Sequence, residues 1–274
     1  MHYGINNLSG KPSQDEIFNM LDYAKENNIE ILDTADAYGN VLDIIGDFHK
    51  GFQKYFRINT KFTVDKNKTV KDQLEISIEK LNVQSVNTYF YHDYNDILKY
   101  PKVPIELLEL KKSGLIKNIG ISVYDNNQFE IAIDSAFIDV IQIPFNLLDN
   151  YKKRGDLLQK AKSKNKEMHV RSVYLQGLLF KDIQKIPAFL YPLIPYINQI
   201  NSLIKKHDKS MDSVALQYVL SKQEIDFVVI GVDNHSQLAK NILDTKSCLP
   251  KKLIEELDCI EVKEQDLLYP YNWK

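Results

Sequence analysis

At 274 residues, with 44% hydrophobic residues and a formal net charge of −2, the chain has enough apolar sequence to bury a large core. The near-neutral charge gives no electrostatic case for binding nucleic acid or an anionic membrane, and no apolar run approaches a membrane span. With only Cys248 and Cys259, no metal-ligand spacing and no signal-peptide pattern, the chain is predicted to be a reduced, cytoplasmic protein.

Strands and helices are predicted to alternate along the chain after a loop over residues 1–12. The pattern from Ser13 to Glu16 is a capping box, and apolar residues at helical spacing follow it. Further helices are predicted over 41–54, 69–81, 104–112, 126–135, 155–164, 196–207, 211–220, 235–243 and 250–260. Strands are predicted over 29–32, 55–60, 86–91, 116–122, 138–143, 167–173 and 227–230. A long insertion, 177–195, precedes the helix near 196.

This repeated alternation predicts a parallel sheet with helices outside it, in one domain spanning residues 1–274. Polar residues stand at the ends of the first three predicted strands. Asp33 ends the first, with Tyr38 shortly beyond it, Lys61 ends the second and His92 the third. The carboxyl ends of strands are the usual place for catalytic residues in α/β barrels.

Each of these residues also has an ordinary structural explanation. An aspartate after a strand is commonly a cap or turn residue, and a tyrosine commonly packs as an amphipathic ring. A lysine after a strand is commonly solvated, and a histidine is often a satisfied surface or core residue. The ordered set of four at successive strand ends is much more specific than any single member.

The ordered set Asp33, Tyr38, Lys61 and His92 resembles the aldo-keto reductase family, whose members use an Asp-Tyr-Lys-His tetrad in this order. The resemblance implies a (β/α)8 barrel and a reaction in which NAD(P)H gives a hydride to an aldehyde or ketone. It also implies a role for each residue. Tyr38 donates or accepts the proton, Lys61 and Asp33 adjust the pKa of the Tyr38 hydroxyl, and His92 orients the carbonyl. The resemblance begins near Tyr3–Asn7, after the family's first strand, so a barrel without that strand is expected.

Cofactor positions follow from the same resemblance. Ser122 and Gln142 match the family's contacts to the nicotinamide amide. A satisfied interior amide is the less favoured alternative for Gln142, because an unpartnered buried amide is disfavoured, and Val123 stands where Asn is common. The stretch 171–179 matches the end of the family's seventh strand, with Arg171, Ser172 and Leu175 at the cofactor. Arg171 stands where many members carry a stacking aromatic, and a structural ion pair is its alternative role.

The region after the last strand corresponds to the family's 2′-phosphate region. Gly231 and Gln237 occupy positions where NADPH-preferring members usually have Lys or Arg, Asp233 adds a negative charge, and Asn241 matches an adenine contact. NAD(H) is therefore weakly favoured over NADP(H). The chain has no GxGxxG or GxxxxGK motif, so neither a Rossmann site nor a P-loop site is supported.

Three functions remain open from the sequence. The first function is a reductase or dehydrogenase for a small carbonyl or sugar substrate. A sugar is suggested because the Leu175–Leu179 segment resembles that of bacterial reductases acting on sugars. The second is a non-catalytic binding or regulatory relative, suggested by the missing strand, Val123 and Gln237. The third is an unrelated hydrolase or isomerase barrel using Asp33 and His92, which leaves Lys61 and Tyr38 unexplained. The segment 180–196 and the tail 269–273 either border the site or simply pack.

Overall fold

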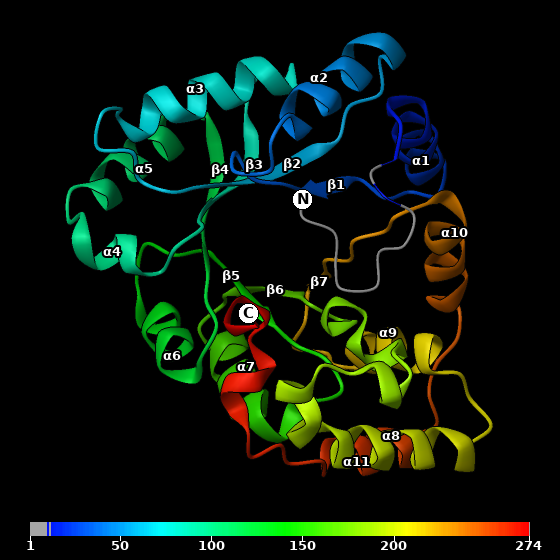
Figure 1. The fold of residues 1–274 in the computed structure, drawn as a ribbon. Helices are drawn as coiled ribbons and strands as arrows, with labels where there is room; N and C mark the ends of the chain where they lie inside the picture. The colour runs from blue at the N-terminus through cyan, green and yellow to red at the C-terminus, as the bar shows by residue number, and fades with distance from the viewer. Residues whose placement is uncertain (1–9, 11, 274) are drawn as a thin grey trace. The chain divides into compact units, whose positions relative to one another are not determined.

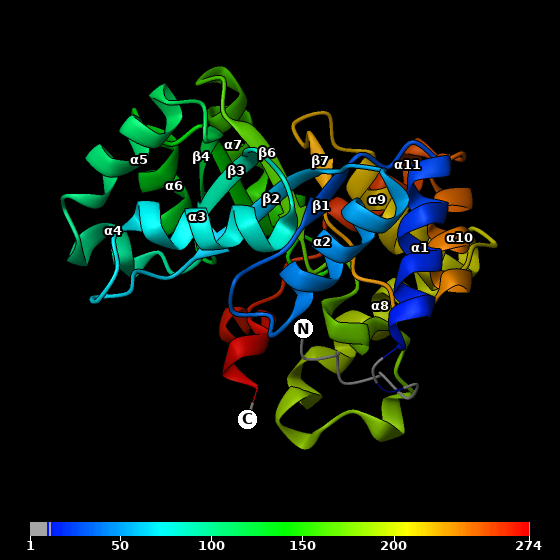
Figure 2. The ribbon, with the colours of Figure 1, turned by 90° about the horizontal axis from the view of Figure 1, so that it is seen from above.

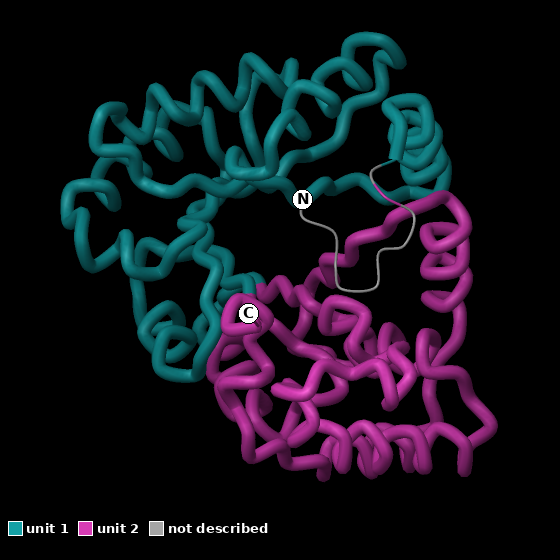
Figure 3. The backbone as a smooth tube through the Cα atoms, viewed as in Figure 1, with its two compact units in different colours: residues 1–2, 12–142, 164–167 teal, residues 3–11, 143–163, 168–274 magenta. Residues whose placement is uncertain are grey.

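The computed structural model describes residue 10 and residues 12–273 (Figure 1). These residues form two compact units (Figure 3). The first unit holds residues 12–142 and 164–167, and the second holds residues 143–163 and 168–273. Most of the predicted opening loop, and the Tyr3–Asn7 stretch at which the family resemblance begins, lie outside the described residues.

The described residues contain seven strands, which follow their sequence order in one sheet and whose recorded pairings are all parallel. They are β1 Ile31–Asp33, β2 Arg57–Phe62, β3 Val86–Tyr91, β4 Ile116–Ser122, β5 Val140–Pro144, β6 Glu167–Arg171 and β7 Phe227–Val228. The predicted parallel α/β architecture is confirmed. The predicted limits of β3 and β4 are confirmed. Both β1 and β2 start two residues later than predicted, and they end one and two residues later, so they include Asp33 and Lys61.

The helices of the first unit follow the strands in alternation. They are α1 Gln14–Glu26, α2 Val41–Phe52, α3 Val70–Leu81, α4 Asn95–Lys99, α5 Val103–Lys112 and α6 Asn126–Asp134. The capping box of Ser13 and Glu16 is present, and Thr69 and Asp72 form a second one at α3. The short helix α4 was not predicted, because five residues are too few to show a helical period.

In the first unit, α2, α3 and α5 lie side by side along strands β2–β4 (Figures 1 and 2). Gly46 of α2 touches α3 so closely that a Cβ there would lie 1.9 Å from the Lys80 carbonyl oxygen. Phe48 of α2 is fully buried and meets Phe18, Phe52 and Phe56 in an aromatic cluster. This packing covers one face of the sheet and leaves the other face for polar side chains.

The strand register determines which side chains share that second face. Asp33 pairs with Asn59, Lys61 with Phe90, Phe90 with Gly120, and Ser122 with Gln142. Paired residues on parallel strands point the same way, and residues two apart on a strand do so as well. Asp33, Lys61, Ser122 and Gln142 therefore share one face of the sheet in the first unit.

The second unit is largely helical outside its strands. Its helices are α7 Tyr151–Ser163, α8 Ile194–Lys206, α9 Met211–Leu220, α10 His235–Asp244 and α11 Lys251–Asp258. Its 3₁₀ turns are η1 Leu175–Phe180, η2 Ile183–Lys185, η3 Ala188–Leu193, η4 Gln265–Leu268 and η5 Pro270–Asn272. The predicted insertion 177–195 is thus a series of tight turns, which hydrophobic periodicity does not reveal.

Buried polar side chains tie the helices of the second unit together. The Asn150 amide donates to the carbonyls of Leu257 and Ile260, at 3.1 and 2.8 Å, where α11 ends. The Lys222 ammonium pairs with Asp258 and lies over the rings of Tyr151 and Tyr218, 4.6 and 4.5 Å from their centroids. These contacts satisfy groups that would otherwise be costly to bury.

Candidate active site

The centre of the candidate site is an ion pair between Asp33 at the end of β1 and Lys61 on β2. The lysine side chain is 3% exposed and the aspartate side chain 11%. The Lys61 ammonium also donates to the Thr34 carbonyl at 3.2 Å and lies over the Phe90 ring, 5.7 Å from its centroid. An ammonium this deeply buried requires such partners, because desolvation of an unpaired charge is expensive.

Gln142 of β5 contacts the same aspartate. Its Nε2 donates to Asp33 Oδ2 at 2.9 Å, while Asp33 Oδ1 takes the bond from Lys61. The glutamine is 1% exposed. Each carboxylate oxygen of Asp33 therefore has a donor of its own.

Tyr38 and His92 meet edge to face, with ring centroids 6.0 Å apart and planes at 85°. Backbone bonds to β2 hold the segments that carry them: Asp36 N–H donates to the Lys61 carbonyl, and His92 N–H to the Phe62 carbonyl. Gly39 follows Tyr38 with φ of 68°, a conformation that favours glycine. Both rings are half-buried, so a phenol and an imidazole lie together beyond the carboxyl ends of the strands.

Ser122, at the end of β4, is 4% exposed and pairs in register with Gln142. Within residues 12–273, no hydrogen bond to its hydroxyl is recorded. Gln142 retains its Oε1 as an acceptor. A hydroxyl and an amide oxygen on one face of the sheet suit a carboxamide ligand, so these two residues fit the nicotinamide end of an NAD(P) cofactor.

In the second unit, the segment that follows β6 has an unusual backbone. Ser172, Leu175 and Gln176 have φ values of 61°, 44° and 52°, which is uncommon for residues with a side chain. The Asn146 side-chain amide donates a hydrogen bond to the Ser172 carbonyl at 3.1 Å. The Arg171 guanidinium contacts the Ser172 hydroxyl at 3.5 Å. Arg171, Ser172 and Leu175, all predicted for the cofactor, therefore lie in or beside one strained segment.

The remaining cofactor candidates also belong to the second unit. Gln237 accepts from the Asp233 N–H at 2.8 Å, and Asn234 caps α10 by accepting from the Gln237 N–H at 2.9 Å. Asn241 accepts from the Tyr174 hydroxyl at 2.7 Å, and burial raises the pKa of Tyr174, so this hydroxyl remains a donor. Gly231 is exposed after β7.

Sequence reasoning missed three contributors in the first unit. Phe90 and the Thr34 carbonyl contact the Lys61 ammonium, and Gly120 makes room for the Phe90 ring. A Cβ at residue 120 would lie 2.4 Å from Phe90 Cδ1. A glycine inside a predicted strand is a known sign of close approach by another group, so Gly120 could have been flagged.

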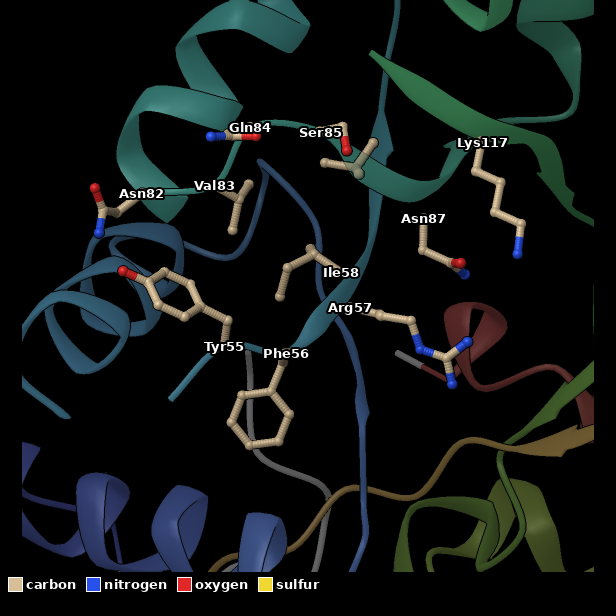
Figure 4. Close-up of a pocket in the computed structure, with 11 residues that line it drawn as sticks. Tyr55, Phe56, Arg57, Ile58, Asn82, Val83, Gln84, Ser85, Asn87 and Lys117 are labelled. Atoms are coloured by element: carbon tan, nitrogen blue, oxygen red, sulfur yellow. The ribbon is translucent and has the colours of Figure 1, made fainter. Parts of the chain in front are cut away.

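A pocket of about 650 Å³ lies at the other end of the same strands (Figure 4). Its lining includes Arg57 at the start of β2, Val86 at the start of β3 and Lys117 near the start of β4. None of the predicted site residues lines it. The pocket is therefore separate from the candidate site, which lies at the carboxyl ends of these strands.

Solved structures of aldo-keto reductases share this fold. An aldo-keto reductase from Bacillus halodurans in its apo form aligns with a TM-score of 0.74 and 20% identity, over 93% of this chain and 90% of that one. A glycerol dehydrogenase from Gluconobacter oxydans aligns with a TM-score of 0.73 and 20% identity, over 94% and 86%. The fold is therefore α/β, of the (β/α)8 barrel type.

Sequence comparison agrees. Aldo-keto reductase str7 of Strobilurus tenacellus is 25% identical over 261 residues, covering 84% of this chain and 76% of the relative. L-galactose dehydrogenase of Arabidopsis thaliana is 24% identical over 293 residues, covering 97% and 90%. The sequence profile of the aldo/keto reductase family matches residues 1–261, so the chain belongs to this family of NAD(P)-dependent oxidoreductases. None of the helices in the described residues combines the length and apolar character needed to cross a bilayer.

Proposed function

We propose that the protein reduces a small aldehyde or ketone, or oxidises the corresponding alcohol, with Tyr38 as the proton donor or acceptor. The observation that carries this proposal is the buried Asp33–Lys61 pair on the same unit as the Tyr38–His92 ring contact. The bound cofactor supplies the hydride. The four side chains supply charge, orientation and the proton.

The role of each side chain follows from elementary acid–base chemistry. A free tyrosine has a pKa of about 10, too high for efficient acid catalysis at neutral pH. The Lys61 ammonium would favour the phenolate and bring Tyr38 toward the working range, while Asp33 orients the ammonium. His92 would hydrogen-bond the carbonyl oxygen and direct its approach.

For the cofactor, we propose that Ser122 and Gln142 contact the nicotinamide amide. Arg171, Ser172, Leu175, Gly231, Gln237 and Asn241 are proposed cofactor contacts from the second unit. The basic side chains that bind a 2′-phosphate in NADPH-preferring relatives are absent at Gly231 and Gln237, and Asp233 has the wrong charge. We therefore expect NAD(H) to bind at least as tightly as NADP(H).

For the substrate, a sugar or polyol is the favoured class. Two relatives, an L-galactose dehydrogenase and a glycerol dehydrogenase, carry the names of polyhydroxylated substrates. Both cysteines are free, in keeping with the proposed cytoplasmic, reducing compartment.

Fluorescence titration with NADH and NADPH tests the cofactor proposal, and a panel of aldoses, polyols and simple aldehydes tests the reaction. Cofactor binding followed by turnover of at least one carbonyl is expected. Binding of cofactor without turnover of any compound on the panel would instead favour the non-catalytic alternative. Binding of NADPH alone would contradict the expected preference.

A further inference from the structure

The contact between Gln142 and Asp33 has a definite polarity. A carboxylate only accepts hydrogen bonds, so the Gln142 amide must present its NH₂ group to Asp33. The amide oxygen is then its one remaining acceptor. One hydrogen of this NH₂ group is therefore bound to Asp33, while the second hydrogen and the amide oxygen can meet other partners.

The two donors on Asp33 act together on its orientation. The terminal torsion of an aspartate is broad, so one donor on one oxygen leaves the carboxylate plane free to rotate. Here Oδ1 contacts Lys61 and Oδ2 contacts Gln142, which fixes the plane. Gln142 is almost fully buried, so little water can replace its bond.

Donation by Gln142 also changes the charge that Lys61 experiences. A hydrogen bond to Oδ2 draws negative charge away from the oxygen that meets the ammonium. More of the lysine's positive potential then remains for a neighbouring phenol. Without the Gln142 donor, Asp33 would neutralise the charge of Lys61 more strongly and would orient the ammonium less well.

We propose that Gln142 is a positioning residue that fixes the orientation of the Asp33 carboxylate. Asp33 in turn keeps the Lys61 ammonium oriented and charged for proton transfer by Tyr38. This inference rests on the proposed function, in which Lys61 tunes Tyr38. It assigns Gln142 a role in proton transfer, whereas the family resemblance implies only a contact to the cofactor amide.

The experiment uses the full chain with Gln142→Met, Gln142→Glu and a control, Gln217→Met. Gln217 is also buried, but its amide donates to the Asp244 carbonyl and the Ser247 hydroxyl in the second unit. Cofactor dissociation constants, kcat as a function of pH, and the ¹H–¹⁵N signal of the Lys61 ammonium are measured. The last is assigned with Lys61→Met and needs neither cofactor nor turnover.

For Gln142→Met we expect kcat to fall about tenfold or more and the alkaline limb of carbonyl reduction to move up by about one pH unit. The cofactor dissociation constant of Gln142→Met should also rise, because methionine lacks the Oε1 that we propose contacts the nicotinamide amide. Gln217→Met should match the wild type in all three readouts. Gln142→Glu should recover activity as the pH falls, because the protonated acid can again donate to Asp33.

Two kinetic results would overturn the inference. One is a tenfold weaker cofactor affinity of Gln142→Met with unchanged kcat, which would make Gln142 a cofactor contact only. The other is a Gln142→Glu profile with no recovery at low pH. If the wild type reduces no carbonyl, the proposed function fails and the ammonium signal decides the inference separately. Broadening in Gln142→Met alone would support positioning, and an unchanged signal would refute it.

Discussion

The buried charge of Lys61 makes Asp33 a residue on which stability depends. Asp33→Asn would leave a 3% exposed ammonium without its carboxylate partner. Breaking one side of such a pair typically costs about 3–5 kcal/mol of unfolding free energy. Urea unfolding of Asp33→Asn should show a loss of that order.

The control for this prediction is an exposed pair on the same unit, Lys71 and Glu75, whose side chains are 60% and 54% exposed. Glu75→Gln should change the unfolding free energy by no more than about 0.5 kcal/mol. Adding Lys61→Met to Asp33→Asn should restore much of the lost stability, because it removes the uncompensated charge. Equal effects of Asp33→Asn and Glu75→Gln would show that burial of the pair has no energetic consequence.

His49 predicts a pH dependence of stability. The ring is fully buried, with Nδ1 2.8 Å from the Leu81 carbonyl and the Phe56 N–H donating to Nε2 at 3.2 Å. Burial lowers the pKa of His49, because a charged ring is desolvated there. As the pH falls, His49 therefore binds a proton in the unfolded state before it does so in the folded state. The contribution of neutral His49 to the unfolding free energy is complete above about pH 6.5 and is lost as the pH falls below it.

The test compares the unfolding free energy at about pH 7.5 and pH 5.5 in the wild type and in His49→Asn. The wild type should lose up to about 1.4 kcal/mol more than the variant, the limit for one group over one pH unit. His235→Gln, which changes an exposed histidine, should behave as the wild type does. Identical pH slopes in wild type and His49→Asn would rule out this linkage.

Packing of α2 against α3 depends on one glycine. Gly46→Ala would put a methyl group 1.9 Å from the backbone oxygen of Lys80, so the helices must separate. The expected cost is about 2–3 kcal/mol, in spite of the better helix propensity of alanine. Gly51→Ala in the same helix meets no atom within 4 Å and should stabilise by up to about 1 kcal/mol. Thermal unfolding of both variants checks the opposite signs.

Elements with local signals could be predicted from the sequence. The capping boxes at Ser13 and Thr69 and the apolar runs of β3 and β4 contain their own start or stop signals. The turns after β6 could not be predicted, because Ser172, Leu175 and Gln176 adopt positive φ without a glycine to indicate it. Tertiary contacts impose that backbone, and periodicity does not record them.

For the molecule as a whole, the order of the polar residues at successive strand ends predicted more of the candidate site than any single motif did. Asp33, Lys61 and His92 could be predicted as a group because parallel strands place their carboxyl ends at one edge. The Gln142–Asp33 bond could not be foreseen, since it joins residues 109 apart in sequence. The division into two units also has no counterpart in composition, so the predicted single domain over 1–274 stays a prediction.

The central claim is proton transfer by Tyr38, and the most direct test is kcat of Tyr38→Phe beside its cofactor dissociation constant. Loss of the hydroxyl should reduce kcat by about 10²–10⁴-fold on the best carbonyl substrate, the usual contribution of general acid catalysis. Cofactor affinity should remain within about threefold of wild type, since only the hydroxyl is removed. Full activity of Tyr38→Phe on that substrate would contradict the proposed mechanism.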